Sequence, residues 1–92
     1  MIVGEILYSN TFCNCYKKIS VELQNITKKK VEIFKTNPLH PSLRLHELHG
    51  KLSGLWSISI NTNYRIIFKR KENGDIIFVI IGKHDTYKNL NN

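Results

Sequence analysis

The dipeptide Asn73-Gly74 stands between two apolar runs, and it constrains the fold more than any other stretch of the chain. Asn-Gly in this setting is the strongest short-range signal of a β-hairpin, because both residues readily adopt the positive φ angles of tight turns. A two-residue loop pairs Glu72 with Asp75 and, further along the ladder, Arg65 with Gly82. The sequence therefore predicts two antiparallel strands that meet at this turn.

The apolar pattern also indicates how the preceding strand joins this hairpin. A three-residue loop at 61–63, with its last residue in a left-handed conformation, pairs Ile60 with Tyr64 and Ser59 with Arg65. A two-residue loop would instead place Ile60 opposite Arg65, and a one-residue slip turns every side chain to the other face. We therefore expect three consecutive antiparallel strands and the three-residue loop.

This register divides the side chains of the three strands between two faces, since directly opposed residues share a face. The predicted core face carries Trp56, Ile58, Ile60, Tyr64, Ile66, Phe68, Val79 and Ile81. The predicted polar face carries Ser57, Ser59, Arg65, Lys69, Gly82 and His84. Ile67, Phe78 and Ile80 also fall on the polar face, which predicts an apolar groove covered by the C-terminal tail or by a partner segment.

The N-terminal part of the chain predicts one strand followed by two helices. Ile2–Tyr8 is rich in strand-forming residues, and Thr11–Ile19 has apolar residues at helical spacing. Ser20 is a typical N-cap for a second helix that continues to about Lys35 and stops before a proline. We expect both helices to pack on the core face, with Pro38–Leu48 as an irregular connection.

Length, charge and cysteine content limit the classes of protein. The 92 residues predict a single domain, 1–92, and no apolar run approaches the ~20 residues of a membrane span. The formal net charge of +7 favours an anionic partner such as nucleic acid, a ribosome or an acidic protein, although a basic protein without that role is the alternative. Without a recognisable signal peptide, we expect a cytoplasmic protein with Cys13 and Cys15 reduced.

Arg65 and His84 are the leading candidates for chemistry. The register makes them diagonal neighbours on the polar face, with Gly82 leaving space between them, although solvated strand residues are the alternative. Arginine matches phosphate geometry with a two-pronged fork, and histidine transfers protons near neutral pH. Cleavage of RNA by its own 2′-hydroxyl needs such groups and no cofactor or metal. The alternative is a metal site with His46, His49, His84 and Asp85 as its ligands.

Two segments resemble a known protein family. NPLHPSLRLHELHGKLSGLWSISINTNYRIIF and IIGKHDTYK resemble the RelE/ParE superfamily of bacterial type II toxin–antitoxin toxins, and RelE-like addiction-module toxins in particular, over residues 37–88. The resemblance implies an α+β, RelE-like fold of order β-α-α-β-β-β, with two N-terminal helices packed on a small antiparallel sheet. It also implies a ribosome-dependent mRNA endoribonuclease, neutralised by a cognate antitoxin in a toxin–antitoxin hetero-oligomer.

The resemblance assigns roles to individual residues. Arg65 matches the arginine that binds phosphate, His84 the terminal acid or base, and His46 the histidine of the HxLxG segment. The candidates for substrate binding are Arg44, Lys51, Lys83 and Tyr87, the last in place of an aromatic that stacks on a base. Ser59 departs from the pattern, because many active members carry arginine or histidine there. A ParE-like poison of DNA gyrase and an inactive module that binds antitoxin or RNA therefore remain as alternatives.

Overall fold

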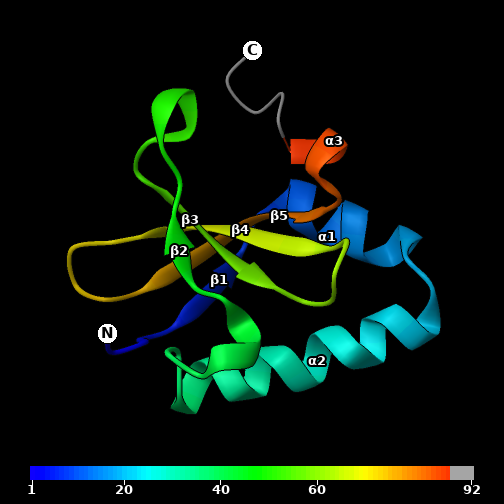
Figure 1. The fold of residues 1–92 in the computed structure, drawn as a ribbon, viewed down its shortest axis with the longest axis horizontal. Helices are drawn as coiled ribbons and strands as arrows, with labels where there is room; N and C mark the ends of the chain where they lie inside the picture. Colours follow the sequence, from blue (N-terminus) through cyan, green and yellow to red (C-terminus); the bar gives the residue numbers. More distant parts are fainter. Residues whose placement is uncertain (88–92) are drawn as a thin grey trace.

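The structure is a computed structural model, and it describes residues 1–87, with side chains for residues 1–85. Its helices are α1 (Asn10–Lys18), α2 (Val21–Thr36) and the short α3 (His84–Tyr87). Its strands are β1 (Ile6–Tyr8), β2 (His46–Glu47), β3 (Leu55–Ser59), β4 (Arg65–Arg70) and β5 (Ile76–Gly82). Two single turns of 3-10 helix, η1 (Pro41–Leu43) and η2 (Gly50–Leu52), flank β2 (Figure 1).

The five strands form one mixed sheet in the order β1-β5-β4-β3-β2. The three strands β3, β4 and β5 are antiparallel as predicted, but β1 pairs parallel with β5, so the prediction of an antiparallel sheet is wrong at that edge. The segment 38–48, predicted to be irregular, contributes β2, which pairs with β3 through His46 and Ser57. Both strands lie at the sheet edges, and the β1–β5 pair joins segments far apart in sequence.

The strand β1 is shorter than the predicted Ile2–Tyr8, because the chain before it turns toward the β4–β5 hairpin. Gly4 donates its backbone N–H to the Gly74 carbonyl at 2.9 Å. A Cβ at Gly4 would lie 2.5 Å from Oδ1 of Asp75, so this close approach requires glycine. The same Asp75 oxygen accepts the backbone N–H of Glu5 at 3.0 Å. The N-terminal segment is thus tied to the hairpin turn and to the start of β5, where the Ile76 N–H donates to the Glu5 carbonyl at 2.9 Å.

Serine caps begin both long helices. Ser9 Oγ accepts the N–H of Phe12 at 3.0 Å, and Ser20 Oγ accepts the N–H of Leu23 at 3.1 Å. The cap predicted at Ser20 is therefore confirmed, and each such cap is worth about 1 kcal/mol. The helix α2 ends at Thr36, with Asn37 as its C-cap, so it stops before the proline as predicted.

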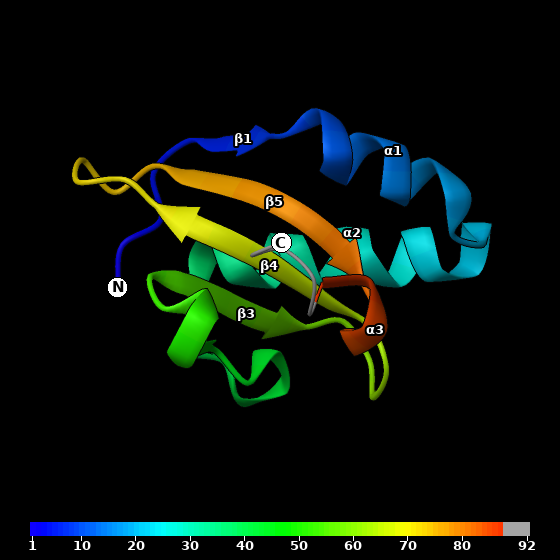
Figure 2. The ribbon, with the colours of Figure 1, turned by 90° about the horizontal axis from the view of Figure 1, so that it is seen from above.

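The hydrophobic core lies between the helices and one face of the sheet. Figure 2 shows α2 running beneath the strands and α1 continuing from the β1 edge. Phe34 of α2 is fully buried, and its ring lies 5.2 Å from Phe68 of β4 and 6.1 Å from Phe78 of β5. Phe12 of α1 lies 5.4 Å from the same Phe78 ring. These aromatic contacts join both helices to the centre of the sheet.

The predicted register between β3 and β4 is confirmed. Ser59 pairs with Arg65 and Ile58 with Ile66, and the N–H of Ile60 donates to the Tyr64 carbonyl at 2.9 Å across the three-residue loop. The left-handed conformation predicted for the last loop residue is wrong, because its φ is not positive. Instead, Oδ1 of Asn61 accepts two backbone N–H groups of the loop and holds the turn.

The predicted two-residue loop of the next hairpin is wrong. The N–H of Lys71 donates to the Asp75 carbonyl at 2.8 Å, so the loop between these two residues has three members, 72–74. Its last residue, Gly74, has a φ of 91°. A β-bulge at Val79 then restores the predicted pairing of Arg65 with Gly82. Between loop and bulge the pairing is shifted by one residue, so residue 78 rather than Val79 joins the main core.

The apolar patch predicted on the polar face is covered by the chain itself. Ile67 and Ile80 are buried there, whereas Phe78 belongs to the main core because of the shifted pairing. The side chains packed against the pair come from α1, from the segment around η2, and from β3 and β5: Cys15, Leu48, Leu52, Leu55 and Val79. This second cluster anchors the η2 segment above the sheet. The alternative cover, the C-terminal tail, lies outside the described residues.

Within residues 1–87, no helix is both long enough and apolar enough to cross a membrane.

Cys13 and Cys15 are both free thiols, as predicted. Both lie in α1, partly buried, where they line different surfaces of that helix.

Candidate functional site

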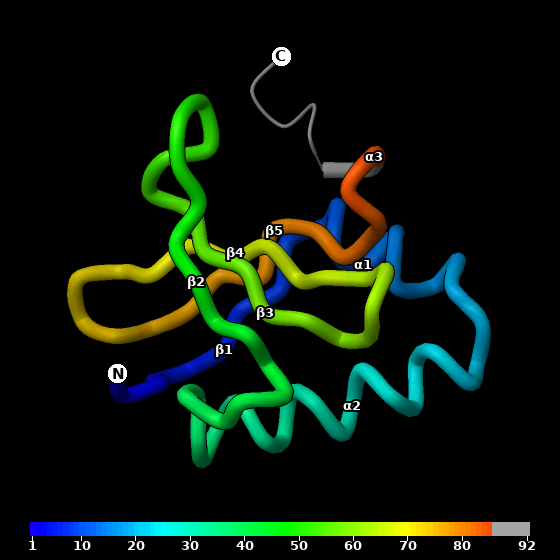
Figure 3. Tube along the Cα trace, in the orientation of Figure 1, coloured from blue at the N-terminus to red at the C-terminus, as the bar shows by residue number. Residues whose placement is uncertain are grey.

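Two adjoining hollows lie at the end of the sheet where β4 begins and β5 ends. The first has a volume of about 450 Å³ and is lined by Thr62, Asn63, Arg65, Lys83, His84 and Asp85. The second has a volume of about 350 Å³ and is lined by Pro41, Ser42, Arg44, Ser59, Asn61, Thr62 and Arg65. Thr62 and Arg65 line both. Figure 3 shows α3 and the η2 segment rising from the sheet on the side opposite α2.

Arg65 stands at the centre of this site. It is the first residue of β4 and is half-buried, and its Nη1 donates to Oγ of Ser59 at 2.7 Å. Ser59 faces it directly across the β3–β4 pair and is almost fully buried. A hydrogen bond from a charged donor to a buried oxygen fixes the guanidinium in one orientation. The remaining N–H groups of the fork are thereby presented in a defined direction at the hollows.

His84 is brought to the same hollow by the end of β5. Gly82 pairs with Arg65, and His84 begins α3 two residues later with an exposed side chain. Arg65 and His84 both line the larger hollow, but the predicted place of His84 on the strand face is wrong, because β5 ends at Gly82 and His84 reaches the hollow from α3. Their chemical roles remain predictions.

Cations outnumber carboxylates around the two hollows. Arg44 lines the smaller hollow and takes a left-handed conformation, with φ of 47°, where the chain turns from η1 into β2. Lys83 lines the larger hollow, and its Nζ lies 5.7 Å from the centroid of the Tyr64 ring. Asp85 is the single carboxylate among the lining residues. Such a surface favours a phosphate-bearing ligand over a cation.

Other predicted site residues lie outside the hollows. His46 opposes Ser57 and shares the polar face, but two strand spacings, on the order of 10 Å, separate β2 from β4. Because a carbonyl oxygen can only accept, His46 Nδ1 donates to the Arg44 carbonyl at 3.0 Å, which leaves Nε2 as the acceptor of the neutral ring. Lys51 is exposed on η2.

The side chain predicted to stack on a base, that of Tyr87, lies outside the described residues.

The histidines predicted as an alternative metal site do not come together. Within the described part of the chain, no three His, Cys, Asp or Glu side chains are close enough to hold a metal ion. His40 has a local role, since its Nδ1 accepts the backbone N–H of Ser42 at 3.1 Å and caps η1.

Two serines of β3 have surroundings that the sequence did not reveal. Ser59, noted only as a missing basic residue, is the hydrogen-bond partner of Arg65. Ser57, two residues earlier on the same face, is fully buried, and its Oγ has no hydrogen-bond partner among the described residues. A buried hydroxyl of this kind costs about 1–3 kcal/mol. The strand register was the signal that could have identified the Ser59–Arg65 contact.

Comparison with known proteins gives a match to a family model. The family model described as "RelE-like toxin of type II toxin-antitoxin system HigB" matches residues 8–84, which is more than half of the chain. A search of curated proteins finds no significant match.

Solved structures of similar fold are toxins and toxin–antitoxin complexes. YafQ from E. coli strain BL21(DE3) superimposes with a TM-score of 0.75 at 20% identity, covering 89% of this chain and 94% of its own. The YoeB/ParE toxin from Agrobacterium tumefaciens gives 0.72 at 13% identity, with 88% and 99% covered. The toxin in the E. coli DinJ–YafQ complex gives 0.73 at 20% identity, with 92% and 97% covered. The fold and the family match together show that the chain belongs to the HigB-like family of RelE-like toxins of type II toxin–antitoxin systems.

Proposed function

We propose that this toxin is an endoribonuclease that cuts mRNA on translating ribosomes in the cytoplasm and thereby inhibits translation. The observation that carries the proposal is the Arg65 guanidinium, held by Ser59 at 2.7 Å and lining the same hollow as His84. A fixed, forked cation beside an imidazole is suited to phosphate chemistry. Membership of a family of toxins supports the proposal that the chain inhibits an essential process of the cell.

The proposed reaction is internal transfer at one phosphodiester. The 2′-oxygen of the RNA attacks the adjacent phosphorus, the bond to the 5′-oxygen breaks, and the products carry a 2′,3′-cyclic phosphate and a 5′-hydroxyl. Arg65 would stabilise the charge that develops on the phosphate oxygens. His84 would give the proton to the leaving 5′-oxygen or take the one from the 2′-hydroxyl. No cofactor takes part in these steps.

The remaining cations would bind the RNA chain on either side. Arg44 lines the smaller hollow and Lys83 the larger one, so a strand that passes Arg65 would meet a cation in each direction. His46, with Nε2 available as an acceptor, and Lys51 would contact RNA or ribosome further along the polar face. Tyr87 is proposed to stack on a base, as the family resemblance implies.

We also propose that a cognate antitoxin binds and neutralises this chain in a hetero-oligomer. The supporting observation is that the solved structures of similar fold include a DinJ–YafQ complex from E. coli and a YoeB–YefM complex from Staphylococcus aureus. The basic character of the chain, with a net charge of +7, suits an acidic protein partner as well as RNA.

Primer extension on a defined mRNA tests the nuclease proposal. Wild type, His84→Gln and His49→Gln are incubated with translating ribosomes, and wild type is also incubated with mRNA alone. His49 is the matched control, since it is exposed and lines neither hollow. We expect cuts only with ribosomes, lost in His84→Gln and retained in His49→Gln.

Three other results would change the proposal. Intact mRNA together with DNA damage signalling would indicate a gyrase poison. Intact mRNA with no arrest of growth when the toxin is produced alone would indicate an inactive binding module. Cuts that persist in His84→Gln would retain the nuclease and remove His84 from its centre.

A further inference from the structure

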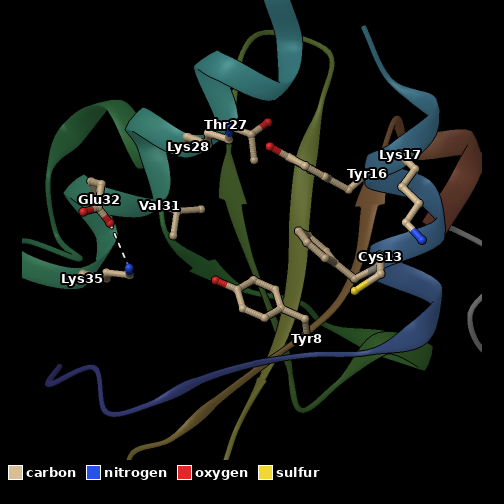
Figure 4. A pocket seen from close by; sticks show the side chains of 10 residues that line it. Tyr8, Cys13, Tyr16, Lys17, Thr27, Lys28, Val31, Glu32 and Lys35 are labelled. Carbon is tan, nitrogen blue, oxygen red and sulfur yellow. Dashed lines mark ion pairs between the residues drawn. The ribbon is translucent and has the colours of Figure 1, made fainter. Parts of the chain in front are cut away.

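A cavity larger than either hollow of the candidate site lies away from the Arg65–His84 hollows. It has a volume of about 600 Å³ and opens between α1, α2 and the end of β1. Figure 4 shows side chains from all three elements converging on it, with Tyr8 on one side and Tyr16 and Thr27 on the other. It shares no lining residue with either hollow of the candidate site. We call it the helix pocket.

The floor of the helix pocket is apolar and aromatic. Phe12 is buried there, and its ring stacks on Tyr16 at 6.0 Å and contacts Tyr8 at 5.5 Å. Val31 of α2 closes the opposite wall. Tyr8 is nevertheless 51% exposed, which leaves an aromatic ring facing solvent at the pocket. Preformed pockets walled by aromatic rings are typical receptors for a single apolar anchor residue.

Two hydroxyls of the pocket wall are already used by the chain itself. The hydroxyl of Thr27 donates to the Leu23 carbonyl at 2.8 Å. The hydroxyl of Tyr16 donates to the Gln24 carbonyl at 3.4 Å. A ligand that needs several hydrogen bonds, such as a nucleotide, would gain little in this cavity. The pocket therefore selects for an apolar group.

The rim of the pocket is basic. Lys17 of α1 and Lys28 and Lys35 of α2 line it, with Glu32 as the single carboxylate. Lys35 Nζ pairs with Glu32 at 2.9 Å, and this hydrogen bond and the carboxylate charge raise the pKa of Lys35. Lys17 and Lys28 have no ion pair among the described residues and are exposed. The rim is thus complementary to carboxylates placed beside an apolar anchor.

We propose that the helix pocket receives a segment of the cognate antitoxin in which an aliphatic or aromatic anchor is flanked by Asp or Glu. This inference rests on the proposed antitoxin partner and adds where it binds and what its chemistry is. A second copy of this chain is disfavoured, because each copy carries +7 and the two would repel. RNA would satisfy the lysines but would leave the apolar floor unfilled.

The position of the pocket has a consequence for neutralisation. Since the pocket and the hollows share no residue, an anchor seated between the helices leaves Arg65 and His84 uncovered. Cleavage must then be prevented by other parts of the antitoxin that cover the site, or by steric exclusion of the complex from the ribosome. The pocket supplies affinity for the antitoxin rather than direct blockade of the site.

Charge reversal at the rim tests the proposal with a matched control. The pocket variant carries Lys17→Glu and Lys28→Glu, and the control carries Lys18→Glu and Lys29→Glu. All four lysines are exposed on the same two helices, but only the first pair lines the pocket. Each variant is titrated with the purified cognate antitoxin. We expect about tenfold weaker binding in the pocket variant and less than about twofold change in the control.

Alkylation of Cys13 provides a second measurement that does not depend on charge. Cys13 lines the pocket, so in a Cys15→Ala background a bound antitoxin is expected to slow its reaction with iodoacetamide by at least about tenfold. Equal binding by both charge variants, together with Cys13 reacting at the free rate in the complex, would overturn the proposal. Loss of ribosome binding rather than antitoxin binding in the pocket variant would assign the rim to RNA and also overturn it.

These measurements are separate from the nuclease assay. Protection of Cys13 together with an absence of mRNA cleavage would refute the proposed nuclease and leave the docking site standing. Cleavage of mRNA by the wild type, with no complex formed with the antitoxin, would support the nuclease and overturn the docking site.

Discussion

Replacing Ser59 with alanine removes the hydroxyl that holds the Arg65 guanidinium. A hydrogen bond to a charged group contributes about 1.5–3 kcal/mol. Because Arg65 is only half-buried, the lower end of this range applies, about 1.5 kcal/mol. Without the bond, the guanidinium spends most of its time in other orientations. Since about 1.4 kcal/mol corresponds to a factor of ten, Ser59→Ala should cut mRNA roughly tenfold more slowly.

The assay is single-turnover cleavage of mRNA on ribosomes stalled with an empty A site. Ser57→Ala is the matched control, because Ser57 lies on the same strand and face but makes no hydrogen bond to Arg65. It should cut at the wild-type rate. In an Arg65→Lys background the fork is absent, so adding Ser59→Ala should slow the reaction by less than about twofold. A wild-type rate for Ser59→Ala, or fully additive losses in the double variant, would refute the reasoning.

Three further predictions concern stability. Phe34→Ala empties the centre of the core and should lower the free energy of unfolding in urea by about 3–5 kcal/mol; a loss below 1 kcal/mol would contradict the packing. Ser57→Ala should leave that free energy unchanged or raise it by about 1 kcal/mol, whereas Ser20→Ala should lower it by about 1 kcal/mol, and the opposite order would be inconsistent with the hydrogen bonds described. Glu32 raises the pKa of Lys35, so their pairing stabilises the fold at neutral pH and this contribution is lost as the pH rises above 10.5; Glu32→Gln should lower the Lys35 pKa in an NMR titration, and an unchanged value would argue against the pair.

Local pattern was sufficient to predict β3, β4 and their register. Alternating apolar residues left one pairing that buried Ile58 and Ile66 together, and the structure confirms it. The β4–β5 hairpin was predicted less well, because the loop is one residue longer than Asn73-Gly74 alone indicates. The bulge at Val79 compensates, and its carbonyl accepts the Ser9 hydroxyl at 2.6 Å. That contact spans most of the chain, so no local signal could reveal the bulge.

The candidate site was partly predictable, because part of it follows from the strand register. Arg65 and Gly82 were placed opposite each other, and His84 followed from its distance along the chain. The pairing of β1 with β5 was not predicted, since it joins the two ends of the sequence. The helix pocket depends on that pairing, because Tyr8 of β1 forms part of its wall. Sites assembled from segments far apart in sequence need the three-dimensional fold.

Cleavage of a chemically modified mRNA tests most directly the claim that the Arg65–His84 hollow catalyses attack by the 2′-hydroxyl. Primer extension first maps the cut, and two mRNAs are then compared on ribosomes, one with ribose throughout and one with 2′-deoxyribose at the scissile nucleotide. The account predicts that wild-type toxin cuts the first mRNA, leaving a 2′,3′-cyclic phosphate, and leaves the second intact. Equal cleavage of both mRNAs, or no cleavage of either, would contradict it.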